Sequence, residues 1–215
     1  MSENIFVEIY ERLFRHFGPQ HWWPGESPFE VCVGAILTQN TNWQNVERAI
    51  KNLKDHELLS PHALYDAPPE VVANLIKPAG YFRVKTKRLK NFIKMLVEEF
   101  EGDLDLLFEL GVQAAREKLL SVSGIGPETA DSILLYAGNL PIFVIDAYTR
   151  RILLRHGLAT EEMDYHELQK LFMDNLPEDV SLFNEYHALL VATGKNYCRP
   201  KKPICSKCPL EGVSY

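Results

Sequence analysis

A Gly-Ile-Gly turn between two apolar segments is the feature that most constrains how this chain folds. The turn lies in the stretch Leu119–Asp146, which reads LLSVSGIGPETADSILLYAGNLPIFVID. Glycine accepts positive φ and allows close approach, and the proline after the turn suits the first position of a helix. We therefore expect a tight turn at Gly124 and Gly126, then a helix to about Ala137 that Gly138 caps.

The start of that helix is a candidate anion site. Its first amides point outward without partners inside the helix, and the helix dipole favours negative charge there. A plain turn between two helices is the alternative, because a glycine motif alone is weak evidence for a ligand. The turn by itself therefore suits a phosphate but does not establish one.

Helical periodicity dominates the chain, and prolines separate the periodic segments. The apolar, β-branched run 142–145 is too short to support a sheet, so we predict an all-α fold. The expected helices cover roughly 3–17, 28–38, 42–54, 69–76, 83–100, 113–121, 127–137, 147–156, 164–175 and 182–195.

Composition indicates a globular protein without a membrane segment. The 215 residues suit one large domain or two small ones, and the 46% hydrophobic content is ordinary for such proteins. The first residues carry too many charges for a signal peptide, and no apolar run could span a bilayer. We expect a cytoplasmic protein, in which reduced cysteines suit metal binding better than disulfides.

Basic residues gather in two stretches that contain no acid. The first holds Lys77, Arg83, Lys85, Lys87, Arg88, Lys90 and Lys94, and the second holds Lys195, Arg199, Lys201, Lys202 and Lys207. Acids concentrate in 98–109 and 161–185, so the net charge of −6 conceals a predicted basic face and acidic back. Ordinary solvated helix faces are the alternative explanation.

These motifs resemble the endonuclease III (HhH-GPD) superfamily of helix-hairpin-helix DNA glycosylases. The matching residues are Val122–Gly126, Thr129-Ala130 and Val144–Asp146, and the resemblance extends from Trp22 to Cys208. It is nearest to the branch that contains endonuclease III-like and 3-methyladenine DNA glycosylases.

The resemblance implies two helical lobes with the active-site cleft between them. One is a six-helix barrel with the hairpin over 20–140, and the other joins 1–19 to 141–215. Double-stranded DNA with a damaged base is the implied partner, and base excision repair the implied process. We expect a monomer that associates with the nucleoid and not with a membrane.

Asp146 precedes a helical segment and is the candidate catalytic carboxylate. Aspartate is also a good N-cap, a role that is compatible with catalysis because it fixes the carboxylate in place. Cleavage of an N-glycosidic bond develops positive charge on the sugar, and a fixed carboxylate stabilises that charge and orients the attacking water. The resemblance implies the same role, since the superfamily places its catalytic aspartate at this position.

Glu128 stands where bifunctional members of the superfamily carry a lysine. That lysine attacks the sugar and forms a Schiff base, which a glutamate cannot do. The chain therefore resembles a monofunctional glycosylase. Glu128 itself is either a first-turn acid favoured by the helix dipole or a pocket residue. The rival functions are a bifunctional glycosylase/AP lyase on oxidised pyrimidines and a non-catalytic DNA-damage binder.

The three tryptophans, Trp22, Trp23 and Trp43, flank the segment 37–41. Core packing is the usual role of such residues, and the alternative is a pocket in which a flipped base stacks. Because indole faces attract cationic rings, a positively charged alkylated purine such as 3-methyladenine suits this pocket. Similar segments occur in the 3-methyladenine branch.

Gln39 matches the glutamine that fills the gap left by the flipped base in endonuclease III-like proteins. Its neighbour Asn40 is a second candidate for DNA contact. Capping of the next helix by Asn40, Thr41 or Asn42 is the alternative for this loop.

Three cysteines near the C-terminus are spaced as C-x6-C-x2-C: Cys198, Cys205 and Cys208. The spacing resembles the [4Fe–4S] loop of the endonuclease III family, whose fourth cysteine falls where this chain has Ser214. Thiolates are the usual cluster ligands, so we expect a cluster with Ser214 at the fourth position. Zinc with an outside ligand such as His187, or a metal-free loop, are the alternatives. Cys32 lies in an apolar segment and is expected only to pack.

Overall fold

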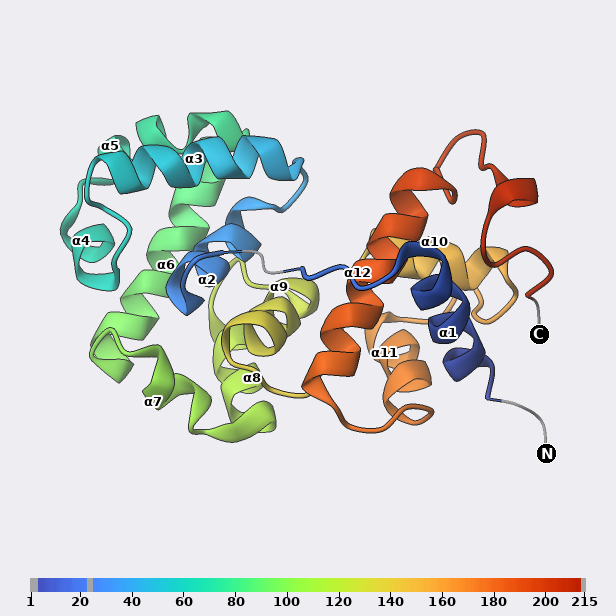
Figure 1. Ribbon diagram of the computed structural model, residues 1–215. Coiled ribbons are helices and arrows are strands. Elements are labelled where there is room, and N and C mark those ends of the chain that lie inside the picture. Colours follow the sequence, from blue (N-terminus) through green and yellow to red (C-terminus); the bar gives the residue numbers. More distant parts are fainter. Residues whose placement is uncertain (1–3, 23–24, 214–215) are drawn as a thin grey trace. The chain divides into compact units, whose positions relative to one another are not determined.

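The computed structural model describes residues 4–22 and 25–213, and every regular element within these ranges is a helix (Figure 1). The predicted all-α class is therefore confirmed. The chain divides into two compact units, one formed by Met1–Trp22 with Pro141–Tyr215 and the other by Trp23–Leu140. Each of the ten predicted helices is present, with ends that differ by only a few residues.

The unit Trp23–Leu140 is built around α2 (Pro28–Leu37), a helix that is apolar on nearly all sides and mostly buried. The Ser27 hydroxyl accepts a hydrogen bond from Glu30 N at 3.2 Å, and Pro28 occupies the first helical position. Around α2 pack α3 (Trp43–Asp55), α6 (Phe82–Phe100) and α9 (Pro127–Ser132). The unit also contains α4 (Pro61–Asp66), α5 (Pro69–Leu75), a 3₁₀ turn (Lys77–Ala79), α7 (Leu104–Phe108) and α8 (Gly111–Ser121).

The helix after the Gly-Ile-Gly turn changes its winding before it ends. It is α-helical over α9 and becomes π-helical over Ile133–Ala137, with Gly138 as its C-cap. Gly138 takes φ −89°, not the left-handed conformation of a usual glycine cap. A Cβ there would lie 2.8 Å from Phe108 Cδ1, so close packing explains this glycine.

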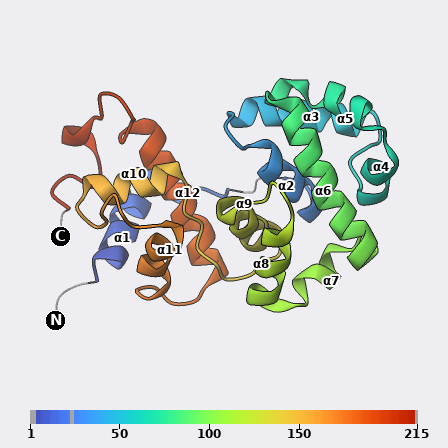
Figure 2. The ribbon, with the colours of Figure 1, turned by 180° about the vertical axis from the view of Figure 1, so that it is seen from behind.

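The second unit contains α1 (Ile5–Phe17), α10 (Ala147–Arg155), α11 (Tyr165–Met173) and α12 (Val180–Asn196) (Figure 2). Its core is aromatic: the rings of Phe143 and Phe172 stack at 4.0 Å, and Phe6 meets Phe172 edge-on at 5.0 Å. Helix α12 packs on α1 and α10. Gly194 allows the approach to α10, because a Cβ there would lie 2.3 Å from Tyr148 Cδ1.

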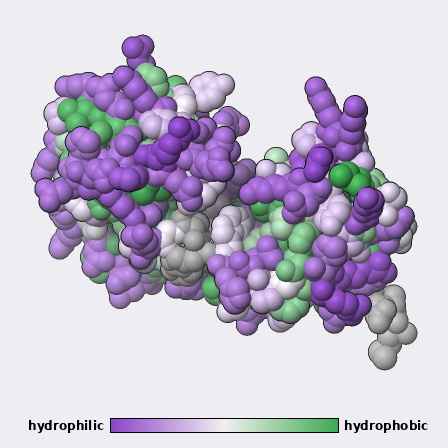
Figure 3. Space-filling view, turned by 45° about the horizontal axis from the view of Figure 1, so that its top comes forward, coloured by the Kyte–Doolittle hydropathy of each residue, from purple (hydrophilic) through white to green (hydrophobic). Residues whose placement is uncertain are grey.

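The buried segment Ile142–Ile145 runs extended into α10 and forms no strand, as its length predicts. Asp146 follows this segment directly and is the N-cap residue of α10. The face seen in Figure 3 is mostly hydrophilic, with apolar residues in small patches. In the described ranges, no helix has the length and apolarity needed to cross a bilayer.

Candidate functional site

The two glycines of the Gly-Ile-Gly turn differ in how strictly the structure requires glycine. Gly124 takes φ +102°, and a Cβ there would lie 2.3 Å from Arg88 Cγ. Both backbone conformation and packing therefore require glycine at this position. Gly126 takes φ −97° and has open space where a Cβ would stand. No side chain caps the amides that follow Gly126 at the start of α9, so this side of the turn is accessible.

Gln39 is turned onto the hairpin in this structure. Its Nε2 donates to Gly124 O at 3.2 Å and to Thr129 Oγ1 at 2.9 Å, and its Oε1 accepts from the Arg88 guanidinium. Asn40 next to it takes the left-handed conformation, with φ +56°. The cap of α3 is Asn42, whose Oδ1 accepts from Asn45 N at 3.0 Å.

Asp146 caps α10 and remains partly open to solvent. Its Oδ1 accepts from Thr149 N at 2.7 Å, and its Oδ2 lies 3.6 Å from His187 Nε2. The Asp146 side chain is 12% exposed. Burial by itself raises the pKa of this carboxyl, but the nearby His187 imidazole, together with the hydrogen bond from Thr149, brings it below its ordinary value. Asp146 is therefore a held carboxylate that is ionised at neutral pH.

His187 on α12 links Asp146 to one of the predicted pocket residues. The Trp22 ring stacks on the imidazole with centroids 5.5 Å apart and an interplanar angle of 26°. The sequence analysis considered His187 only as an outside zinc ligand and did not connect it to Asp146. A histidine within the apolar run Tyr186–Val191 is the sequence signal that could have singled it out.

Trp43 belongs to the unit Trp23–Leu140. Trp43 packs on α2, where a Cβ at Gly34 would lie 3.2 Å from its Cη2, so it contributes to the packing of that unit. Trp23 lies outside the described residues.

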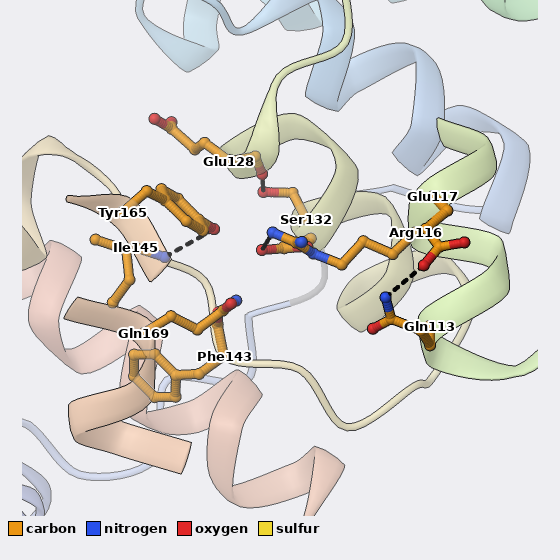
Figure 4. Close-up of polar contacts among 10 residues, drawn as sticks. Gln113, Arg116, Glu117, Glu128, Ser132, Phe143, Ile145, Tyr165 and Gln169 are labelled. Carbon is orange, nitrogen blue, oxygen red and sulfur yellow. Dashed lines mark hydrogen bonds and ion pairs between the residues drawn. The ribbon is translucent and has the colours of Figure 1, made fainter. Parts of the chain in front are cut away.

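Glu128 stands in the first turn of α9, where its carbonyl oxygen accepts from the Ser132 hydroxyl at 2.7 Å (Figure 4). Three residues further along the same helix, Asp131 is fully buried and forms an ion pair with Arg116 of α8. Arg116 Nε lies 2.6 Å from Asp131 Oδ1, and Arg116 Nη2 lies 3.1 Å from Asp131 Oδ2. This bidentate pair, which the sequence analysis did not predict, fixes the hairpin helix to α8.

Two lysines of the first basic stretch point into the protein, which corrects the predicted basic face. Lys85 is 1% exposed and donates from Nζ to Leu37 O at 2.8 Å and to Ala79 O at 2.7 Å. Burial lowers the pKa of Lys85, and the Arg88 charge lowers it further. Lys90 donates to three carbonyls at the end of α4, those of Leu64, Tyr65 and Ala67. The sequence-based count of surface cations was therefore too high by these two.

The three cysteines of the C-terminal loop line one cavity of about 200 Å³ together with Arg155 and Tyr197. Cys198 is buried, Cys208 is half-buried and Cys205 is exposed. Arg155 Nη1 donates to Cys198 Sγ at 3.3 Å. Ser214 lies outside the described residues. Within the part of the chain that the structure describes, no three Cys, His, Asp or Glu side chains converge on one ion position.

Cys32 is buried in α2, and burial raises the pKa of its thiol, as a packing role requires.

Comparison with known proteins gives the family. Residues 33–178 match the model of the HhH-GPD superfamily base excision DNA repair proteins. A Methanocaldococcus jannaschii protein named as a DNA repair glycosylase is 45% identical over 98% of this chain and 97% of its own length. Endonuclease III of Thermotoga maritima is 31% identical over 98% of this chain and 91% of its own length.

A solved structure of the H. pylori 3-methyladenine DNA glycosylase MagIII, bound to 1,N6-ethenoadenine, superposes with a TM-score of 0.77. That protein is 27% identical, and the match covers 89% of this chain and 97% of the neighbour. These matches confirm the predicted family and the helical fold of its members. The chain belongs to the HhH-GPD superfamily and is a DNA glycosylase of base excision repair.

Proposed function

We propose that this glycosylase is monofunctional and hydrolyses the N-glycosidic bond of an alkylated purine, with Asp146 as its catalytic carboxylate. The observation that carries the proposal is the state of Asp146. One carboxylate oxygen caps α10, the other faces His187, and the side chain keeps 12% of its surface exposed. Such a group is fixed and ionised but still reachable by a substrate.

The chemistry follows from that state. As the base departs, positive charge develops on the sugar, and a fixed carboxylate stabilises it without reorganising. The same carboxylate orients or deprotonates the attacking water. A protein that only binds DNA gains nothing from a buried negative charge near phosphates, which argues against the non-catalytic alternative.

Glu128 supports hydrolysis without strand cleavage. A lysine at this position of the hairpin helix attacks the sugar in bifunctional relatives, and a carboxylate cannot form the required imine. The similarity to Thermotoga maritima endonuclease III keeps the bifunctional enzyme as the rival function. The two are separated by whether a covalent protein–DNA adduct forms.

The presence of Trp22 and Trp43 favours a substrate whose damaged base is electron-poor. A cationic alkylated purine already has a weak glycosidic bond, and an indole face attracts its charge. The 3-methyladenine glycosylase to which this chain is similar agrees with that class. We propose Gln39, Asn40, Gly124 and Gly126 as DNA contacts, which requires Gln39 to leave its hydrogen bonds with the hairpin.

The spacing of the cysteine loop carries the cluster proposal, because it resembles the [4Fe–4S] loop of the endonuclease III family and thiolates are the usual cluster ligands. Cys198, Cys205 and Cys208 line one cavity, which places the three thiols around the same space. We propose these thiols, with Ser214 at the fourth position, as ligands of a structural cluster that takes no part in base release. Anaerobically purified protein is then brown, and Ser214→Cys retains more iron in air.

A panel of duplexes that each carry one modified base tests the activity. Single-turnover excision of 3-methyladenine or a related alkylpurine should exceed excision of uracil, thymine glycol, or adenine opposite 8-oxoguanine. Strand breaks should appear only after alkali or an added AP endonuclease. Oxidised pyrimidines released at least as fast as alkylpurines would refute the substrate class.

Borohydride reduction tests the monofunctional mechanism. The wild type should give little trapped protein–DNA adduct, and Glu128→Lys, which places an amine at the lysine position, should give more. Efficient trapping by the wild type at the rate of base release would establish the bifunctional rival. Trp43→Ala should reduce the alkylpurine preference by roughly 1–3 kcal/mol, the scale of one base–aromatic stack. Trp43→Phe is its control for lost packing on Gly34.

A further inference from the structure

The His187 imidazole uses its edge and its face for different neighbours. Its Nε2 edge lies 3.6 Å from Asp146 Oδ2, and its ring plane stacks on Trp22 at a centroid distance of 5.5 Å. His187 is only 4% exposed. The imidazole orientation that faces the carboxylate is therefore held by the stack and by the interior of the unit.

Several polar and charged side chains of α10, α11 and α12 near Asp146 and His187 in the sequence bond to backbone groups. Four of them bind backbone groups: Arg150 to Met163 O, Arg151 to Cys198 O, Tyr186 to Phe6 O, and Glu185 to Gln20 N. From α11, the Tyr165 hydroxyl accepts from Ile145 N (Figure 4). Of the ionisable side chains, His187 is the one whose charge acts on Asp146.

We infer that His187 is a positioning residue for the catalytic carboxylate, which it orients through Oδ2 while Trp22 fixes the imidazole. The inference rests on the proposed catalytic role of Asp146. Thr149 N already determines where Oδ1 lies, so a second contact at Oδ2 fixes the rotation of the carboxylate plane. Trp22 then has a structural task besides any base stacking, because one indole face is covered by His187.

The same contact sets the charge state of Asp146. Burial raises the pKa of Asp146, and the His187 imidazole 3.6 Å away is the foremost of the neighbours that offset it. Without the imidazole, the burial effect remains with less to oppose it. The pKa of Asp146 should then rise, and the enzyme should lose activity at a higher pH on the acidic side.

Three variants measured in single-turnover excision test this role. His187→Ala removes the contact, and His187→Gln keeps an amide nitrogen near the Nε2 position at similar volume. His187→Ala should lower the rate at pH 7 by roughly 10-fold to 100-fold, the rate equivalent of one polar contact to a charged group. Its acidic limb should move to higher pH, and His187→Gln should restore part of the rate. His166→Ala, an exposed histidine on α11, is the matched control and should leave the profile in place.

A titration without DNA separates this inference from the proposed function. Carboxyl ¹³C NMR, with Asp146→Asn to identify the signal, should show a higher Asp146 midpoint in His187→Ala and His187→Gln than in the wild type. An unmoved midpoint and pH profile, with Asp146→Asn inactive, would overturn the His187 role and leave the proposed function intact. Full excision by folded Asp146→Asn would instead overturn the proposed function. If His187→Ala does not fold, His187→Gln carries both measurements.

Discussion

Asp131 and Asp146 are both carboxylates that face a nitrogen-bearing side chain, and they are held in different ways. The Asp131 side chain has no exposed surface, and each of its two oxygens accepts a hydrogen bond from Arg116, at 2.6 and 3.1 Å. Asp146 receives one backbone bond at 2.7 Å, lies 3.6 Å from His187, and keeps 12% of its side chain exposed. The first arrangement leaves no carboxylate surface exposed, whereas the second leaves part of the Asp146 side chain exposed.

The comparison assigns the two carboxylates different tasks, stability at Asp131 and, in the function we propose, catalysis at Asp146. A bidentate guanidinium satisfies a carboxylate completely and ties two helices together. The N-cap at Asp146 engages one carboxylate oxygen, while the other oxygen faces His187. Substitutions at the two sites should therefore affect different measurements.

The largest expected effect is on stability at the Asp131 site. Arg116→Ala leaves the fully buried Asp131 without its guanidinium, which should lower the free energy of unfolding by about 3–5 kcal/mol. Urea denaturation measures the loss. Lys118→Ala is the control on the same helix, because its pair with Glu99 is exposed and should contribute at most about 1 kcal/mol. A loss at Arg116 no larger than at Lys118 would contradict the comparison.

Asp146→Asn should give the next largest effect, and on rate instead of stability. Asparagine caps a helix about as well as aspartate, so the free energy of unfolding should change by less than about 1 kcal/mol. Excision should lose about 2 kcal/mol or more of transition-state stabilisation. Binding to an uncleavable duplex should persist or tighten, since a negative charge near phosphate is removed. Near-normal excision by the folded variant would refute the catalytic assignment.

Asp146→Ala separates capping from charge. Both variants remove the carboxylate, but only alanine removes the acceptor for Thr149 N. Asp146→Ala should therefore be less stable than Asp146→Asn by about 0.5–2 kcal/mol, the usual value of an N-cap. Equal thermal and urea stability of the two variants would mean that the cap contributes nothing measurable.

The smallest effect is the pH dependence of stability at Asp146. Its pKa is lower in the folded protein than its ordinary value, so the carboxylate adds stability that is fully present above about pH 3.9. This contribution is lost as the pH falls through the folded pKa. The difference in unfolding free energy between wild type and Asp146→Asn should therefore change in the acid range and stay constant near neutrality. A difference that is constant throughout would contradict the lowered pKa.

Local signals explain why part of this architecture could be predicted from the sequence. The Gly-Ile-Gly turn, the proline after it and the capping aspartate act within a few residues of one another, and their spacing is readable. The short helices α4 and α7 were missed although Ser60 and Asp103 cap them, because so few residues show no clear period.

Contacts between distant segments could not be predicted in the same way. His187 lies 41 positions after Asp146 in the chain, and no local pattern connects the two. Arg116 and Asp131 belong to different helices, so their pairing depends on how α8 and α9 pack. Lys85 was counted with the basic face because a sequence shows the charge of a side chain but not its burial, and in the structure Lys85 is buried. Gln39 matched the gap-filling glutamine of endonuclease III-like proteins, but its hydrogen bonds to the hairpin depend on the conformation of the folded loop.

The inward lysines of α6 limit how this helix can respond to salt. A lysine that neutralises a DNA phosphate releases a condensed counterion and adds about 0.9 to the slope of log binding constant against log salt concentration. Lys85 and Lys90 are bound to carbonyls that close neighbouring helices, so they release none. The stretch from Lys77 to Lys94 therefore offers counterion release from its exposed cations, Lys77, Arg83, Lys87 and Lys94, and from the half-buried Arg88.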